Sequence, residues 1–238
     1  ERQMSDAYKE GYFELQRGDV LLAAKKFNEA ELLFPQSPWA AKSAIMAAYA
    51  YYTQNYYGDA IFELERYLVT YPNHRDKVYA HFLLGMSFYE QIVDEKKDLK
   101  SIVDSKKIFL DIIKKYPQTD FSIDAEFKIN LINDILAAKE IYIGRYYLNK
   151  KKWVASINRF RTVIDSYDTT VYVEEALYRL VEIHYLIGLE EEAKKYANTL
   201  GYNYGSSQWY EKSYAIFDKM YEKNKKDKKK SKDKLNSS

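Results

Sequence analysis

Apolar side chains recur along this chain at intervals of three and four residues, which is the spacing of one face of an α-helix. Five such segments each end in an aromatic residue followed by a turn residue: Phe34-Pro35, Tyr71-Pro72, Tyr116-Pro117, Tyr167-Asp168 and Tyr204-Gly205. Proline stops a helix because it lacks a backbone donor and its ring blocks the preceding turn. The five marks therefore predict the ends of five helices in a repeated unit.

Each segment carries the same order of side-chain sizes before its turn residue. A small residue stands twelve positions earlier, a large one usually eight earlier, and a medium one five earlier. These residues are Ala23, Phe27 and Ala30; Ala60, Leu64 and Tyr67; Ser105, Phe109 and Ile112; Ser156, Phe160 and Val163; and Ala193, Ala197 and Leu200. Offsets of four and three place them on one helical face, so each segment is the second helix of a pair.

The first helix of each pair has a mark of its own, a small residue followed by an aromatic one three positions later. It occurs at Ala48 and Tyr51, Gly85 and Phe88, and Gly144 and Tyr147, and Gly11 stands at the same place in the first pair. Small residues let a partner helix pack closely. Two residues after three of the turn marks stand the candidate helix N-caps, Ser37, Thr119 and Thr170.

These marks predict an all-α, TPR-like helix-turn-helix solenoid over residues 1–222. It has about five helix pairs and a C-terminal capping helix from Ser207 to about Tyr221. Uneven repeat spacing is explained by a polar loop over 94–100 and a long helix over 122–149. The solenoid is expected to divide into an N-terminal, substrate-groove half, about 5–117, and a C-terminal, partner-binding half, about 118–222. Residues 223–238 are predicted to be a disordered lysine-rich tail.

Composition argues against an enzyme. The chain has 238 residues, 47% of them hydrophobic, and no cysteine, which excludes thiolate nucleophiles and cysteine-ligated metals. The three histidines, His74, His81 and His184, show no ligand spacing, and no phosphate-binding loop is present, so we expect no metal and no cofactor. His81 and His184 are predicted to be packing or groove residues, and His74 a turn residue.

The charge pattern argues against nucleic acid as a partner. The net charge is +2, but residues 222–238 hold eight lysines against three acidic residues, and the rest of the chain is slightly acidic. The longest apolar run, Ala44 to Tyr52, has nine residues, so no transmembrane helix is expected. The chain is expected to be either cytosolic or a mature form whose export signal has been removed.

The 25 tyrosines suggest protein recognition, because tyrosine gives a large contact area at a small entropy cost. An apolar trough on the first helices would bind an extended, aromatic-bearing peptide, with Lys42, Arg66 and Arg75 as candidate cations for a carboxylate. Alternatively, many of these rings fill gaps between helices. The predicted groove residues are Tyr8, Tyr12, Tyr49, Tyr52, Tyr79, Phe82, Met86 and Tyr89.

The order of the motifs resembles one family, the BamD-type TPR lipoproteins of the bacterial β-barrel assembly machinery. The resemblance spans residues 5 to 217. The segments that carry it are Tyr8 to Gly11, Gly18-Asp19, Ala23 to Phe27, Phe34 to Ser37, Ala48 to Tyr52, Tyr71 to His74, Tyr116 to Thr119 and Trp153 to Arg159. The sequence departs from the family pattern at Asp168, where the turn proline is missing, and in the lysine-rich tail.

The resemblance implies a periplasmic protein, anchored to the outer membrane through a lipidated N-terminal cysteine that this sequence lacks. It implies binding of unfolded outer-membrane proteins by the N-terminal repeats, and of the POTRA region of the barrel protein BamA by the C-terminal repeats. Arg159 matches a family arginine implicated in the BamA contact, and we group its neighbour Arg161 with it; both are alternatively solubilising charges. Two other functions stay open: a free peptide- or chaperone-binding TPR adaptor in the periplasm or cytosol, and a regulatory module of a cell-envelope enzyme.

Overall fold

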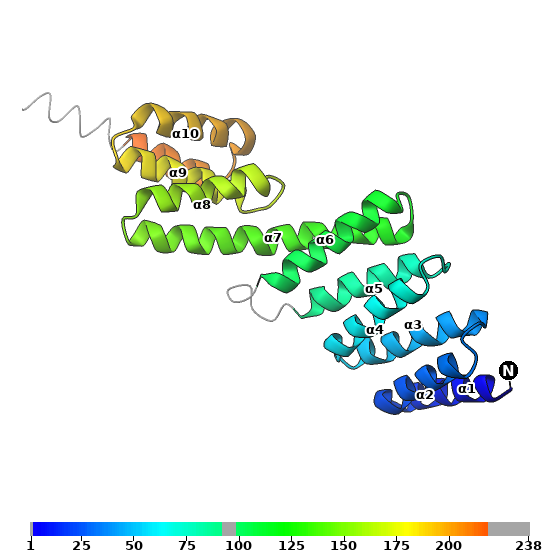
Figure 1. Cartoon of the computed structure of the whole chain (residues 1–238). Helices are drawn as coiled ribbons and strands as arrows, with labels where there is room; N and C mark the ends of the chain where they lie inside the picture. The colour runs from blue at the N-terminus through cyan, green and yellow to red at the C-terminus, as the bar shows by residue number, and fades with distance from the viewer. Residues whose placement is uncertain (1, 92–98, 219–238) are drawn as a thin grey trace, which may run out of the picture. The chain divides into compact units, whose positions relative to one another are not determined.

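Ten complete helices make five consecutive pairs in the computed structural model, which describes residues 2–91 and 99–218 (Figure 1). A further helix covers 208–218. The described residues contain no strand, and the predicted all-α, TPR-like fold is confirmed. The pairs are α1 (Arg2–Arg17) with α2 (Val20–Leu33), α3 (Pro38–Thr53) with α4 (Tyr57–Thr70), α5 (Lys77–Glu90) with α6 (Lys100–Lys115), α7 (Asp120–Asn149) with α8 (Trp153–Ser166), and α9 (Val173–Leu186) with α10 (Glu190–Tyr204).

In three of the five pairs, the glycine of the first helix lies against the large ring of the second helix. A Cβ atom added to Gly85 would lie 2.8 Å from the ring of Phe109, and one added to Gly144 would lie 2.6 Å from Phe160. The large ring of the second helix therefore packs directly on the backbone of the first. Ser156 adds a hydrogen bond to this contact, in which its hydroxyl donates to the Gly144 carbonyl at 2.8 Å. The pattern of side-chain sizes does not predict this bond.

Two of the three predicted N-caps are confirmed. The Ser37 hydroxyl accepts the backbone N–H of Trp39 at the start of α3, and the Thr119 hydroxyl accepts that of Ser122 at the start of α7. The third prediction, Thr170, is wrong. An extra turn follows it, so α9 begins only at Val173 and Tyr172 takes the N-cap position. The Thr170 hydroxyl donates to the Tyr167 carbonyl.

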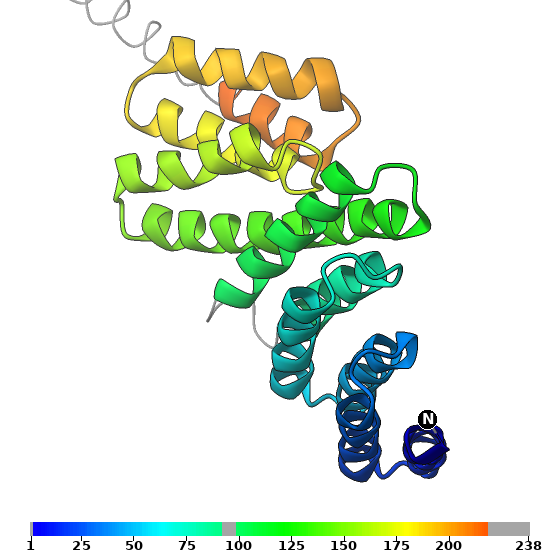
Figure 2. The same cartoon turned by 45° about the vertical axis from the view of Figure 1, so that its right-hand side comes forward.

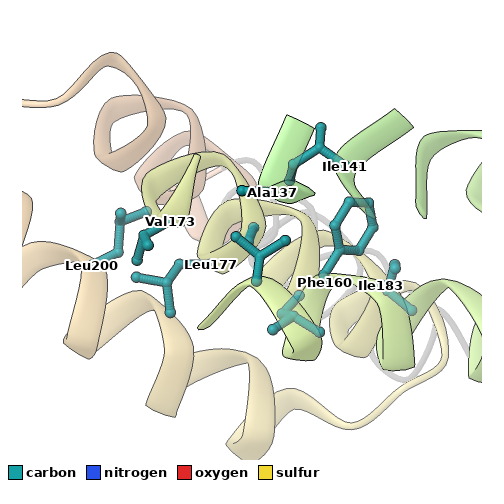
Figure 3. Close-up of a cluster of buried hydrophobic side chains, with 10 residues drawn as sticks. Ala137, Ile141, Phe160, Val173, Leu177, Ile183 and Leu200 are labelled. Carbon is teal, nitrogen blue, oxygen red and sulfur yellow. The ribbon is translucent and has the colours of Figure 1, made fainter. Parts of the chain in front are cut away.

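The chain divides into two compact units within α7, between Ile132 and Asn133. Unit 1 comprises α1 to α6 with the first part of α7, and each helix from α1 to α5 packs against the next one in the chain (Figures 1 and 2). Unit 2 comprises the rest of α7, α8 to α10 and the helix over 208–218. Figure 3 shows its core, in which Ala137 and Ile141 of α7 surround Phe160 with Leu177 and Ile183 of α9.

The boundary between the predicted halves, at 117/118, precedes the unit boundary because α7 contributes to both units. The predicted loop over 94–100 lies outside the described residues except for Leu99 and Lys100, and Lys100 begins α6. The predicted tail over 223–238 lies wholly outside them. Of the predicted capping helix, residues 208–218 are helical, and its last residues are not described.

Candidate functional site

The first helices of unit 1, α1, α3 and α5, carry the eight predicted groove residues, and we call this surface the first-helix face. Tyr12 of α1 and Tyr49 of α3 are exposed there, and the other six are partly exposed. On α3, Tyr49 and Tyr52 stand three positions apart, which places them on the same side of the helix. The face thus offers ring surface and hydroxyl groups together.

A hollow of about 580 Å³ lies at the end of this face, between the start of α1 and the start of α3. The ring of Tyr8 meets that of Trp39 edge to face, with 5.5 Å between centroids. The ammonium group of Lys42 lies 4.7 Å from the Trp39 ring centroid. The hollow is lined by Met4, Ser5, Tyr8, Lys9, Phe34, Gln36, Ser37, Pro38 and Trp39. An aromatic side chain bound here would find apolar walls and a cationic rim.

The sequence prediction missed Trp39. The groove residues were predicted from the pattern of a small residue followed three positions later by an aromatic one, which lies in the middle of each first helix. Trp39 stands instead in the first turn of α3. The sequence does contain a signal that could have identified it. Trp39 directly follows the N-cap Ser37 and the first helical residue Pro38, and a large apolar ring has no role in capping a helix. Trp39 is exposed in the structure, so its ring is available to a ligand.

Farther along the face, several predicted residues pack within unit 1. The Phe82 ring lies 5.7 Å from Phe109 and 5.4 Å from Phe121 of α7, so much of it fills the gap between three helices. Tyr79 also contacts Phe121, at 5.9 Å. Tyr89 lies under the ammonium group of Lys128, 4.5 Å from its ring centroid. The accessible aromatic surface is therefore centred on α1 and α3.

Of the three candidate cations, Arg66 is engaged within the fold. Its two terminal nitrogens bind both carboxylate oxygens of Glu31 at 2.8 and 2.7 Å, and its Nε binds Glu63 at 2.9 Å. Glu31 is only 6% exposed, and a buried carboxylate requires such compensation. The hypothesis that Arg66 serves a ligand is therefore wrong. Lys42 and the exposed Arg75 remain beside Trp39, where both line a second hollow of about 360 Å³.

The histidines have structural contacts. His81 and His184 each place Nδ1 on a backbone carbonyl one turn earlier, as expected of packing residues. His74 lies in a turn, and its Nδ1 accepts the backbone N–H of Asp76. The buried Tyr67 hydroxyl lies 2.8 Å from the same nitrogen, so the hydroxyl also donates to His74. No cluster of three or more His, Asp or Glu side chains suited to a metal occurs in 2–91 or 99–218.

Burial raises the pKa of several tyrosine hydroxyls of unit 1. It raises the pKa of Tyr79 to about 12, with smaller contributions from Tyr49 and Tyr52, and that of Tyr67 to about 12. The pKa of Tyr52 is also raised, first by burial and then by the carboxylate of Glu90. At neutral pH these groups are hydrogen-bond donors as well as acceptors.

In unit 2, the predicted partner residues lie on α8. Arg159 reaches across to Glu140 of α7, and one nitrogen, Nη1, contacts both carboxylate oxygens at 3.3 and 3.2 Å. The Arg159 side chain is 43% exposed and that of Glu140 is 14% exposed. Because a single nitrogen makes both contacts, much of the guanidinium stays open to a further acceptor. Arg161 is exposed on the same helix.

Comparison with known proteins assigns the chain to a family. The family described as YfiO, outer membrane lipoprotein, matches residues 1–200. The chain belongs to this family. It is 38% identical to the outer membrane protein assembly factor BamD of Caulobacter vibrioides over 216 residues, covering 91% of this chain and 71% of that protein. It is 41% identical to BamD of Rickettsia prowazekii over 209 residues, covering 88% and 83%.

Membership of the BamD family confirms the resemblance of the sequence motifs and gives the general function. The chain is a non-enzymatic factor of outer membrane protein assembly that is associated with the outer membrane and its assembly complex. None of the helices in the described part of the chain is long and apolar enough to span a membrane.

Proposed function

We propose that this chain is a scaffold subunit of the outer-membrane β-barrel assembly complex with two binding regions. The first-helix face of unit 1 binds unfolded segments of outer-membrane proteins, and unit 2 couples to the POTRA region of a BamA-type barrel protein. The subunit works at the periplasmic face of the outer membrane, held there by a lipid on an N-terminal cysteine that is not in this sequence. The observation that carries the proposal is the exposed aromatic surface around Trp39 in a chain of the BamD family.

The chemistry of the first-helix face suits an unfolded chain. Tyr8, Phe34 and Trp39 surround a hollow large enough for an aromatic side chain, and Tyr12 and Tyr49 continue the surface. Tyrosine hydroxyls serve as donors and acceptors for the backbone of an extended peptide, while the rings exclude water from these bonds. Such a surface requires an aromatic residue in the right place and tolerates many sequences around it, as a general assembly factor requires.

The chemistry of α8 suits a partner that carries a carboxylate. Arg159 binds Glu140 through one nitrogen, so its other guanidinium nitrogens are available to a partner. Arg161 adds a second positive charge on the same helix. Guanidinium groups bind carboxylates through two parallel hydrogen bonds, which gives both affinity and orientation. We therefore assign the BamA-type contact to Arg159 and Arg161.

A direct test measures binding of fluorescein-labelled peptides, taken from the last strand of an outer-membrane porin, by fluorescence anisotropy. The full chain should bind them more tightly than scrambled peptides of the same composition, and Trp39→Ala should weaken the binding. Tyr202→Ala is the matched control, because Tyr202 is a fully exposed ring in unit 2. Equal binding of native and scrambled peptides, or unchanged binding by Trp39→Ala, would contradict the proposed peptide site.

A further inference from the structure

The hollow beside Trp39 has a structural counterpart in unit 2. Four residues of unit 2 each stand 170 positions after a residue of unit 1 that lies at or beside this hollow. We call the four residues of unit 1 the unit 1 aromatic site and their counterparts the unit 2 aromatic site. The pairs of equivalent residues are Tyr8 and Tyr178, Ser37 and Ser207, Trp39 and Trp209, and Lys42 and Lys212.

The two aromatic sites have the same geometry. The tyrosine and tryptophan ring centroids lie 5.5 Å apart in unit 1 and 5.3 Å apart in unit 2. The lysine ammonium lies 4.7 Å from the tryptophan ring centroid in unit 1 and 4.1 Å from it in unit 2. In both sites the serine hydroxyl accepts the backbone N–H of the tryptophan, at 3.2 Å and 3.1 Å. The two sites can therefore be compared residue by residue.

The unit 2 aromatic site is surrounded by carboxylates of its own chain. The Ser207 hydroxyl donates a hydrogen bond to the carboxylate of Glu174, in the first turn of α9. The guanidinium of Arg179 lies over the rings of this site, and it binds the carboxylates of Glu175 and Glu182 at 3.3 and 2.8 Å. The serine donor and the cation beside the rings are thus both satisfied within unit 2.

The unit 1 aromatic site lacks these carboxylates, because the equivalents of Glu174, Glu175 and Glu182 are Met4, Ser5 and Tyr12. Ser37 lines the hollow and is only 9% exposed, yet its hydroxyl finds no hydrogen-bond acceptor in residues 2–91 or 99–218. Lys9, which lines the same hollow, and Lys42 form no ion pair within those residues. A buried donor without an acceptor is unfavourable, so a ligand that supplies the acceptor is stabilised here.

We propose that the unit 1 aromatic site binds a carboxylate that lies next to an aromatic ring in the extended polypeptide. The carboxylate takes the place that Glu174 has in unit 2, where it accepts a hydrogen bond from the Ser37 hydroxyl beside the ammonium groups of Lys9 and Lys42. Charge-assisted hydrogen bonds are stronger than neutral ones, and the neighbouring ring of the ligand packs on Trp39. The inference rests on the proposed peptide-binding function and adds the chemical class of the bound residue.

Either an acidic side chain or the end of a polypeptide can supply this carboxylate, and labelled twelve-residue peptides distinguish the two sources. One peptide ends in an aromatic residue with a free terminal carboxylate. Another carries an aspartate next to an internal aromatic residue and has an amidated end. Each has a partner peptide in which an amide replaces that carboxylate. In fluorescence anisotropy, the full chain should bind at least one carboxylate peptide roughly 10-fold more tightly than its amide partner.

Two substitutions test whether the carboxylate binds at Ser37. Ser37→Asp keeps a good helix N-cap but replaces the hydroxyl donor with a negative charge, so it should abolish the preference for the carboxylate. Met4→Glu places an acid at the position equivalent to Glu174 and should abolish the preference as well. Lys212→Gln, the matched control, removes the lysine from the unit 2 site and should keep it. Circular dichroism and thermal unfolding confirm that each variant is folded.

The outcomes separate the two proposals. If neither carboxylate peptide binds the wild-type chain more tightly than its amide partner, the site does not select a carboxylate, although the peptide site stands. If Ser37→Asp and Met4→Glu both keep the full preference, the carboxylate does not bind at Ser37 and the inference is wrong. If no peptide binds the wild-type chain, the proposed function fails and the inference fails with it.

Discussion

The hydroxyl of Ser156 on α8 donates a 2.8 Å hydrogen bond to the carbonyl of Gly144 on α7, the same glycine on which the Phe160 ring rests. The bond and the ring contact together fix the distance between the two helices. Gly144→Ala would place a methyl group 2.6 Å from that ring. We expect a loss of about 1–2 kcal/mol in the free energy of unfolding, because overpacking outweighs the better helix propensity of alanine.

Urea denaturation measures this effect, and Gly58→Ala is its matched control. Gly58 is also helical, but nothing lies within 4 Å of a Cβ added there. The control should gain up to about 1 kcal/mol from propensity alone. If both variants gained stability, the close contact between α7 and Phe160 would be disproved.

The large ring of each second helix should dominate the stability of its pair. Phe160 is fully buried among α7, α8 and α9 (Figure 3). Phe160→Ala should reduce the free energy of unfolding by about 3–5 kcal/mol. Phe62→Ala removes the same ring from an exposed site on α4 and should cost much less. Similar midpoints for the two variants in a urea titration would contradict the assignment of the core.

The two arginine–glutamate contacts described above should differ in their contribution to stability. Arg66→Ala leaves the buried Glu31 without its cation, and we expect a loss of about 3–5 kcal/mol. Arg159→Ala breaks a longer, half-exposed contact and should cost less than about 1 kcal/mol. Thermal and urea unfolding of both variants tests this. A larger loss for Arg159→Ala would make Arg159 a structural residue.

Alkaline pH should destabilise the chain through its buried tyrosines. Tyr67 and Tyr79 have folded pKa values of about 12, above the ordinary 10.0 of the unfolded chain. The stability that their burial contributes is fully present below pH 10 and is lost as the pH rises from 10 toward 12. Urea midpoints measured across this range should fall, and Tyr79→Phe should fall less steeply. A midpoint independent of pH over that range would contradict the burial of these hydroxyls.

Local rules predicted the fold from the sequence. The small and large residues at fixed distances from each turn located the second helices, and the glycines at 85 and 144 met the predicted rings. Thr170 failed as an N-cap because an extra turn separates it from Val173, the first residue of α9. Thr119 donates backward in the same way, to the Tyr116 carbonyl, and still caps α7. Spacing alone does not distinguish a helix that begins at once from one that begins after an extra turn.

The candidate site was less predictable because it depends on contacts between repeats. Arg66 and Glu31 are thirty-five positions apart, and no local pattern indicates that they bind each other. Phe82 has the spacing of a groove residue, yet Phe109 and Phe121 cover much of it. Trp39 stands in the first turn of α3, where periodicity carries little information. The position of each depends on packing between helices that a single-helix pattern does not contain.

We propose that unit 2 couples this chain to a POTRA-bearing barrel protein through Arg159. The most direct measurement is co-purification of that protein from detergent-solubilised envelopes with wild type, Arg159→Glu and, as a charge-matched control, Arg17→Glu, whose exposed arginine lies on α1. Equal helicity is first confirmed by circular dichroism. We expect capture by wild type and Arg17→Glu and loss in Arg159→Glu. Equal capture by all three would remove Arg159 from the contact, and no capture by wild type would contradict the coupling itself.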